Sequence, residues 1–221
     1  MIMAIYCAMD FKSCSSVLAM VFGVATMLPH APAFAKTSTF PFQPDEKLMV
    51  DIMKAKNVEY FLMLNKQKGQ MLLIADGKII QKVSALSGHK KGDATDIPMT
   101  TPAGIFPLNI TSDQSDPNAA LIFFERNNGT VDAIHRVINV AGENRENRLQ
   151  SSSASFKRVS HGCINLSPKD YITVSNFANN SPSVLTTPTG EKTPPQSYLV
   201  VLPERTTPSK FFGMPTHQFP Q

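Results

Sequence analysis

The chain has few cysteines, three in 221 residues. Cys7 and Cys14 both lie within the first 35 residues, which are predicted to be an export signal, so only Cys163 remains after cleavage. A lone thiol cannot form an intramolecular disulfide, which argues against a disulfide-stabilised scaffold. An exported protein that keeps one unpaired thiol is better explained by a nucleophile than by a structural thiol, although free cysteine is often simply buried.

The chain also lacks an apolar run of membrane-spanning length at its N-terminal end. The run over residues 17–28 has 12 residues, whereas a spanning helix needs ~20. Lys12 precedes this run, and a small-x-small pattern ends at Ala35, as in a secretory signal cleaved after that residue. We therefore expect export to the periplasm or cell wall, with no stable membrane anchor after cleavage. An uncleaved anchor is the alternative.

The sequence also lacks a strong net charge and the spacing of ligand residues that is typical of metal sites. The formal net charge is +4, which suits an anionic polymer but fits many other partners. No cluster of Lys and Arg is interleaved with aromatic residues, so nucleic-acid binding has no support. His135, His161 and Cys163 could in principle bind zinc, but no CxxC or paired spacing supports a site. No metal or other cofactor is expected.

What the sequence does contain is a series of short strand-like runs. A helix is expected at 45–56. Strands are expected at 58–64, 70–75, 78–86, 105–110, 120–125, 130–135, 183–187 and 198–202. Asp76-Gly77 and the turn at 126–129 predict two hairpins, and hence antiparallel neighbours.

A second helix is expected directly after the cysteine. Ser167 is a suitable cap, Pro168 suits the first helical position, and the helix should run to about Ala178 with Ile172 and Phe177 facing the core. Strands and helices do not alternate along the chain. The fold class predicted is mostly β: an antiparallel sandwich or barrel-like catalytic domain with one main helix after the cysteine motif and a short N-terminal helix.

The domain boundaries follow from this pattern. They are a signal at 1–35, a linker and helix at 36–57, a catalytic domain at 58–202, and a proline-rich tail at 203–221. Residues 141–159 are polar and serine-rich and are predicted to form a long surface loop.

The residues around Cys163 carry the chemistry. They read Ser160-His161-Gly162-Cys163-Ile164-Asn165-Leu166. A thiol with a reference pKa of ~8.5 needs a nearby cation or oriented N–H groups to ionise at neutral pH. His135, at the end of a predicted strand, is the preferred base and could form a thiolate–imidazolium pair. His161 is a competing base, and is otherwise expected to position the substrate or stabilise the oxyanion.

This motif, with His135 and the upstream run Thr101-Pro102-Ala103-Gly104, resembles the YkuD-type catalytic domain of the L,D-transpeptidases over about residues 58–202. The resemblance implies that Cys163 is the nucleophile and His135 the base. It also implies a supporting role for Ser160, His161, Gly162 and Asn165. Residues 136–159 make a longer gap between the histidine and the motif than is usual in this family.

The resemblance further implies a peptidoglycan stem peptide as substrate, with a thioester on the cysteine and an amine as acceptor. The acceptor could be a second stem or a wall-attached protein. Arg136 and Arg158 are candidates to bind the substrate carboxylates. Two alternatives stay open: a carboxypeptidase or wall-protein-releasing hydrolase on the same scaffold, and a non-catalytic wall-binding module.

Overall fold

The structure is a computed structural model, and it describes residues 40–110, 116, 119–184 and 190–213. The predicted signal at 1–35 lies outside these residues. Within the described part of the chain, no helix has both the length and the apolar character needed to cross a membrane.

The N-terminal helix α1 covers Pro44–Ala55, close to its predicted bounds. Proline at the first helical position and acids in the first turn favour a helix start, because the first N–H groups have no intrahelical partner. The Glu46 carboxylate accepts a hydrogen bond from the Gln43 backbone N–H at 3.0 Å. Met49 and Met53, one turn apart, are fully buried and fix α1 against the neighbouring sheet.

The larger sheet has five strands in the order β3-β2-β1-β11-β5. These are β1 (Tyr60–Asn65), β2 (Gln70–Ala75), β3 (Lys78–Ser84), β5 (Gly104–Pro107) and β11 (Tyr198–Val201). Strands β2 and β3 form the hairpin predicted at Asp76-Gly77, and both turn residues have positive φ, 50° and 69°, as a type I′ turn requires. Strand β11 runs parallel to β1.

The smaller sheet has the order β10-β8-β7-β6. Its strands are β6 (Asn109–Ile110), β7 (Ala120–Glu125), β8 (Val131–Arg136) and β10 (Ile164–Leu166). The predicted β7–β8 hairpin is confirmed, and β10 is parallel to β8. A separate parallel pair joins β4 (Ser87–Gly88) to β9 (Arg158–Ser160). The mostly β class is therefore confirmed, but the pairing is mixed rather than purely antiparallel.

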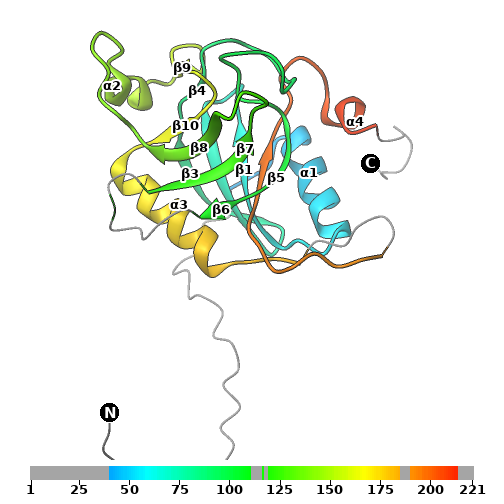
Figure 1. The fold of residues 1–221 in the computed structure, drawn as a ribbon. Coiled ribbons are helices and arrows are strands. Elements are labelled where there is room, and N and C mark those ends of the chain that lie inside the picture. The colour runs from blue at the N-terminus through cyan, green and yellow to red at the C-terminus, as the bar shows by residue number, and fades with distance from the viewer. Residues whose placement is uncertain (1–39, 111–115, 117–118, 185–189, 214–221) are drawn as a thin grey trace, which may run out of the picture. The chain divides into compact units, whose positions relative to one another are not determined.

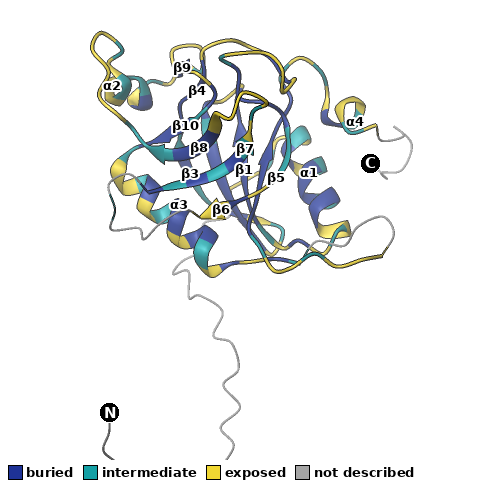
Figure 2. Cartoon of the chain, in the orientation of Figure 1, coloured by how far each residue is buried: buried dark blue, intermediate teal, exposed yellow. Residues whose placement is uncertain are grey.

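The main core lies between the two sheets. On β1, Leu62 and Leu64 join the cluster shared with the smaller sheet and helix α3 (Pro168–Asn180), whereas Phe61 and Met63 pack with α1. This alternation follows from the two-residue period of a strand. Figure 1 shows α1 and α3 on opposite sides of the central strands, and Figure 2 shows these strands almost entirely buried.

Helix α3 begins as predicted, because Ser167 Oγ accepts a hydrogen bond from the Asp170 N–H at 3.1 Å. Phe177 is buried, as expected. The prediction for Ile172 was wrong: this side chain is 45% exposed, and Tyr171 and Val174 face the core instead. The buried apolar face of α3 consists of Tyr171, Val174, Phe177 and Ala178.

Two other expectations were wrong in detail, and a third falls mostly outside the described residues. The single strand expected at 105–110 divides into β5 and β6, which belong to different sheets, because the chain turns at Leu108 and its N–H donates to Ser197 O at 2.9 Å. The loop expected at 141–159 contains helix α2 (Arg145–Gln150), anchored by buried Leu149. Of the strand expected at 183–187, Ser183 forms one bridge, and residues 185–189 lie outside the described residues. The tail includes the short helix α4 (Pro208–Phe211).

Candidate active site

Cys163 lies in the turn between β9 and β10, and hydrogen bonds hold this turn from within. Ser160 Oγ donates to the Cys163 carbonyl at 2.5 Å and accepts from the Gly162 N–H at 3.2 Å. The Gly162 carbonyl accepts from Thr101 Oγ1 at 2.8 Å, and that hydroxyl in turn accepts from the Gly88 N–H at 2.9 Å. The two motifs singled out in the sequence are thus joined directly, and Ser160 and Thr101 fix the cysteine backbone.

Gly162 is required by its backbone and by its neighbours. Its φ is +148°, and a Cβ atom would overlap Asp132 Oδ1 and approach Arg126 Nη2 to 2.6 Å. Those two side chains form an ion pair beneath the turn, with Arg126 Nη2 2.5 Å from Asp132 Oδ2. Burial raises the pKa of Asp132, and the Arg126 guanidinium opposes that shift. The cysteine turn therefore rests on a mostly buried pair of charges.

A cleft of about 590 Å³ opens beside this turn. It is lined by His161 and Cys163, by the loop at 95–99 and by residues of the β7–β8 hairpin between 124 and 132. Arg126 connects these walls, because its Nη2 also donates to Thr100 O at 2.8 Å. Sequence reasoning missed Arg126 and Asp132. The available signal was an acid at an inward-facing position of the strand predicted at 130–135.

His135 lies on the same face of the smaller sheet as Cys163. On the parallel strands β8 and β10, His135 is opposite Asn165, and Cys163 precedes Asn165 by two residues. Cys163 directly precedes β10; extending that strand by one residue, with a strand spacing of ~4.8 Å and a rise of ~3.3 Å per residue, gives a separation of roughly 8 Å between the Cβ atoms of Cys163 and His135. A thiol and an imidazole can span that separation when they point toward each other.

In this structure the imidazole points elsewhere. His135 Nδ1 is 2.6 Å from the Arg136 carbonyl oxygen, and Nε2 is 3.0 Å from Asn165 Nδ2. The Cys163 thiol is 3.9 Å from Val131 O. The structure thus brings His135, Asn165 and Cys163 to one face, but both ring nitrogens of His135 have partners other than the sulfur.

The pKa directions favour a neutral pair in the resting protein. Burial raises the pKa of the Cys163 thiol; the Ala133 backbone N–H opposes this shift, Asp132 adds to it, and the cations Arg126 and Arg145 oppose it. Burial lowers the pKa of His135, while the Arg136 carbonyl opposes that shift. Both directions disfavour a thiolate–imidazolium pair before substrate binds. This geometry suits general-base activation of a thiol during attack.

The two predicted substrate arginines have other partners. Arg136 stacks on the Tyr171 ring, with 4.5 Å from its guanidinium carbon to the ring centroid. Arg158 is buried and forms an ion pair with Glu204. Neither residue lines the cleft beside Cys163, and their role in substrate binding stays a prediction.

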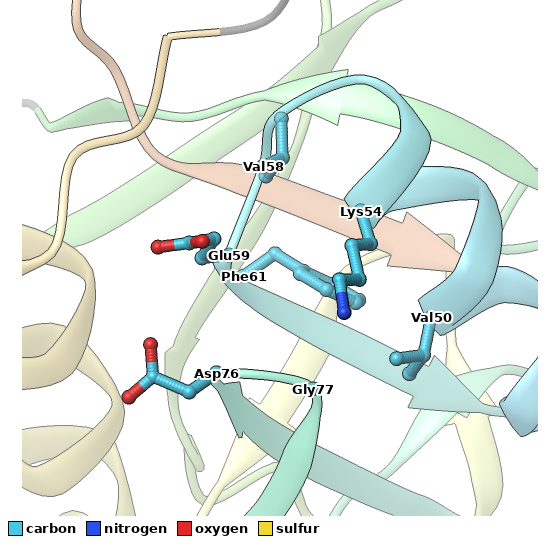
Figure 3. Close-up of a pocket in the computed structure, with 7 residues that line it drawn as sticks. All are labelled: Val50, Lys54, Val58, Glu59, Phe61, Asp76 and Gly77. Atoms are coloured by element: carbon cyan, nitrogen blue, oxygen red, sulfur yellow. The ribbon is translucent and has the colours of Figure 1, made fainter.

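A second, smaller pocket of about 100 Å³ lies between α1 and the β2–β3 turn. Figure 3 shows Lys54, Glu59 and Asp76 around it, together with apolar side chains from α1 and β1. None of the residues predicted to carry chemistry lines this pocket. Among the residues that the structure describes, no three His, Cys, Asp or Glu side chains gather closely enough to hold a metal ion.

A comparison with protein families matches residues 59–194 to the YkuD model, which describes an L,D-transpeptidase catalytic domain. The match covers more than half of the chain and includes Cys163 and His135. No curated protein matches the chain.

Solved structures with a similar course of the chain include three L,D-transpeptidases. The one from Xylanimonas cellulosilytica is 14% identical, with a TM-score of 0.36, over 66% of this chain and 61% of the other. The one from Mycobacterium smegmatis is 18% identical, with a TM-score of 0.35, over 65% and 58%. The one from Enterococcus faecium is 16% identical, with a TM-score of 0.36, over 65% and 50%. The matched part thus spans between half and two thirds of each of these chains.

Proposed function

The chain belongs to the YkuD family of L,D-transpeptidase catalytic domains, and from this premise we propose that it is a cysteine acyltransferase acting on peptidoglycan stem peptides. The observation that carries the proposal is Cys163 at the wall of an open cleft, in a turn fixed by Ser160 and Thr101, with His135 on the same sheet face. A buried structural thiol would not need this arrangement.

In the proposed first half-reaction, Cys163 Sγ attacks the carbonyl carbon of the peptide bond before the terminal residue of a tetrapeptide stem. The S–H proton passes to His135 Nε2 as the S–C bond forms, and the resulting imidazolium protonates the departing amine when the C–N bond breaks. Because burial lowers the pKa of His135 and raises that of Cys163, which favours a neutral resting pair, this proton transfer is proposed to accompany attack. His161, exposed in the cleft, is proposed to donate a hydrogen bond to the carbonyl oxygen as it becomes negative.

In the second half-reaction an amine attacks the thioester. His135 accepts a proton from the amine as the C–N bond of the new amide forms, and passes that proton to Sγ as the C–S bond breaks, which regenerates the thiol. The acceptor is proposed to be the side-chain amine of a second stem or a wall-attached protein. A catalytic domain of this kind would act at the cell wall after export, which agrees with the signal predicted at 1–35.

The experiment incubates purified protein with disaccharide-tetrapeptide stems and identifies the products by mass. Cross-linked dimers, or exchange of the terminal D-amino acid, support transfer. Release of tripeptide alone would replace the proposal with the hydrolase alternative. Cys163→Ala should abolish all products, and absence of every product with the wild-type chain would favour the wall-binding alternative.

The choice of base is tested by two single variants compared side by side. His135→Ala is expected to lower kcat by about 10²–10⁴-fold, the range for loss of a general base. His161→Ala is expected to have a smaller effect, because other groups still contact the substrate. The reverse order would make His161 the base.

A further inference from the structure

Arg145 connects the long segment after β8 to the candidate active site. It lies at the first position of α2, and its Nη1 donates to Asn165 Oδ1 at 2.7 Å. Asn165 Nδ2 is 3.0 Å from His135 Nε2, and His135 Nδ1 is 2.6 Å from Arg136 O. A continuous series of hydrogen bonds thus runs from a surface helix to the proposed base.

The donors and acceptors in this series allow one arrangement of protons. A backbone carbonyl only accepts, so His135 Nδ1 must carry a hydrogen. A guanidinium only donates, so it must face the oxygen of the Asn165 amide, which turns the amide NH₂ toward His135. Because that NH₂ donates, Nε2 must hold a free lone pair. The imidazole is therefore neutral and protonated at Nδ1, the form that can accept the thiol proton at Nε2.

We infer that Arg145 is a positioning residue for the base: by holding Asn165 Oδ1, it keeps the amide NH₂ on Nε2 and so keeps His135 in its proton-accepting tautomer. The inference rests on the proposed function, in which His135 Nε2 takes the proton of Cys163. With the amide turned over, Oδ1 would face Nε2 and favour a hydrogen there. The ring would then be either the Nε2–H tautomer, which gives up the Nδ1–H bond to Arg136 O, or the imidazolium, and neither form offers the thiol a lone pair at Nε2.

Both ends of the Arg145–Asn165 contact are fixed, as positioning requires. The Arg145 side chain is 12% exposed, and its Nε forms an ion pair with Glu143 Oε2 at 2.5 Å. Asn165 is fully buried. Its backbone exchanges two hydrogen bonds with Leu86, at 2.9 and 3.1 Å. The remaining freedom of Asn165 is rotation about its Cβ–Cγ bond, which would exchange Oδ1 and Nδ2. The hydrogen bond from Arg145 to Oδ1 opposes this rotation.

The charged surroundings agree with this role. The charged and titratable groups on the elements around His135 are Asp132 and Arg136 on β8, Arg126 paired with Asp132, Glu125 on β7, Cys163 before β10, Lys169, Asp170 and Tyr171 on α3, and Arg145, Glu146 and Arg148 on α2. Of these side-chain charges, Arg145 affects the pKa of His135, and its positive charge lowers that pKa. For Cys163, the charge of Arg145 opposes the rise in pKa that burial causes. The cation favours an imidazole that is neutral before attack.

The proton transfer releases the series at one point. Before the proton can pass, the ring must turn its Nε2 from Asn165 Nδ2 toward the sulfur, while Nδ1 keeps its bond to Arg136 O. When the S–H bond then breaks, an N–H bond forms at Nε2, and that nitrogen can no longer accept from Asn165. Arg145 therefore acts on the resting state of the base and makes no contact with the substrate in this proposal.

The test reads the tautomer directly, by ¹⁵N NMR of the imidazoles in the histidine-labelled chain, with His135→Gln used to assign the signal. The wild type should show a hydrogen at Nδ1. Arg145→Gln should shift the signals toward the Nε2–H form, raise the apparent pKa of His135, and lower kcat roughly ten- to a hundredfold with little change in KM. Arg145→Lys should restore part of each effect, because one donor remains.

Asn165→Asp provides a second variant of nearly the same shape. Its carboxylate would accept from Arg145 and from Nε2–H together, so the imidazole should become protonated at Nε2 and its pKa should rise. Glu146→Gln, on the exposed face of the same helix, is the matched control and should leave tautomer and rate unchanged. If Arg145→Gln does not fold, the ¹⁵N signals of Arg145→Lys and Asn165→Asp still report the tautomer of His135.

An unchanged Nδ1–H tautomer in Arg145→Gln or Asn165→Asp would overturn the inference, even if activity fell, because a purely structural role would lower activity without moving the proton. The NMR measurement needs no substrate. An inactive wild-type chain would therefore contradict the proposed function without affecting this test.

Discussion

Lys66 provides the sharpest test of what holds the cysteine turn in place. Its ammonium is completely buried and donates to Gly92 O at 2.7 Å, Thr101 O at 2.8 Å and Asp93 Oδ1 at 2.9 Å. Thr101 in turn donates to the Gly162 carbonyl. We therefore expect that Lys66→Met, which keeps the volume but removes the charge, will leave buried acceptors unpaired and loosen the support of the cysteine turn.

The magnitude follows from the burial. Removing one member of a buried ion pair costs about 3–5 kcal/mol, because the remaining charge has no partner. Asp93 keeps its hydrogen bonds from the Glu204 and Arg205 N–H groups, at 2.9 and 2.8 Å, so the lower end of that range applies. The free energy of unfolding should fall by about 3 kcal/mol. For a domain of this size, such a loss lowers Tm by about 6–12 °C.

Urea unfolding followed by circular dichroism measures this loss, with Lys68→Met as the matched control. Lys68 is exposed, and its substitution should change stability by less than about 0.5 kcal/mol. Asp93→Asn offers a second route, because it neutralises the other member of the pair. If Lys66→Met and Lys68→Met lose the same small amount, the buried pair does not support the fold as argued.

Three further predictions concern the site and the helix beside it. Gly162→Ala should lower the free energy of unfolding by about 1–3 kcal/mol, because the φ of +148° disfavours alanine and the added Cβ would overlap Asp132. The same substitution should reduce alkylation of Cys163. A variant with wild-type stability and reactivity would contradict the packing described. Alkylation of Cys163 by iodoacetamide should increase with pH, with a midpoint above that of a free thiol, because burial raises the thiol pKa; a midpoint below the free-thiol value would indicate a preformed thiolate. Ser167→Ala should cost about 1 kcal/mol in urea unfolding through loss of the α3 cap, and no loss would mean that water replaces the hydroxyl.

The sheets show which parts of the fold can be predicted from local sequence. The Asp76-Gly77 turn and the turn at 126–129 predict hairpins. In each, a short run of turn-forming residues reverses the chain and so pairs the two flanking strands. The parallel pairing of β10 with β8 has no such local signal. It joins segments about thirty residues apart, and its register depends on packing.

Helix α2 was missed for a related reason. It has six residues and lies in a polar segment without an apolar period, so propensity alone does not predict it. Its contacts are tertiary: Leu149 packs with Leu86 and Val159, and Arg145 binds Asn165. The same limit applies to the candidate site. Cys163 and His135 could be predicted from residue type and spacing, whereas Arg126 and Asp132, whose role depends on tertiary contacts, could not.

The central claim is that Cys163 takes an acyl group from a stem peptide, and intact-protein mass spectrometry tests it most directly. The wild-type chain, mixed with excess tetrapeptide stem and quenched in acid, should gain the mass of the stem without its terminal residue. Peptide mapping should place the added mass on Cys163. An adduct on another residue, or the same adduct on Cys163→Ala, would contradict the account.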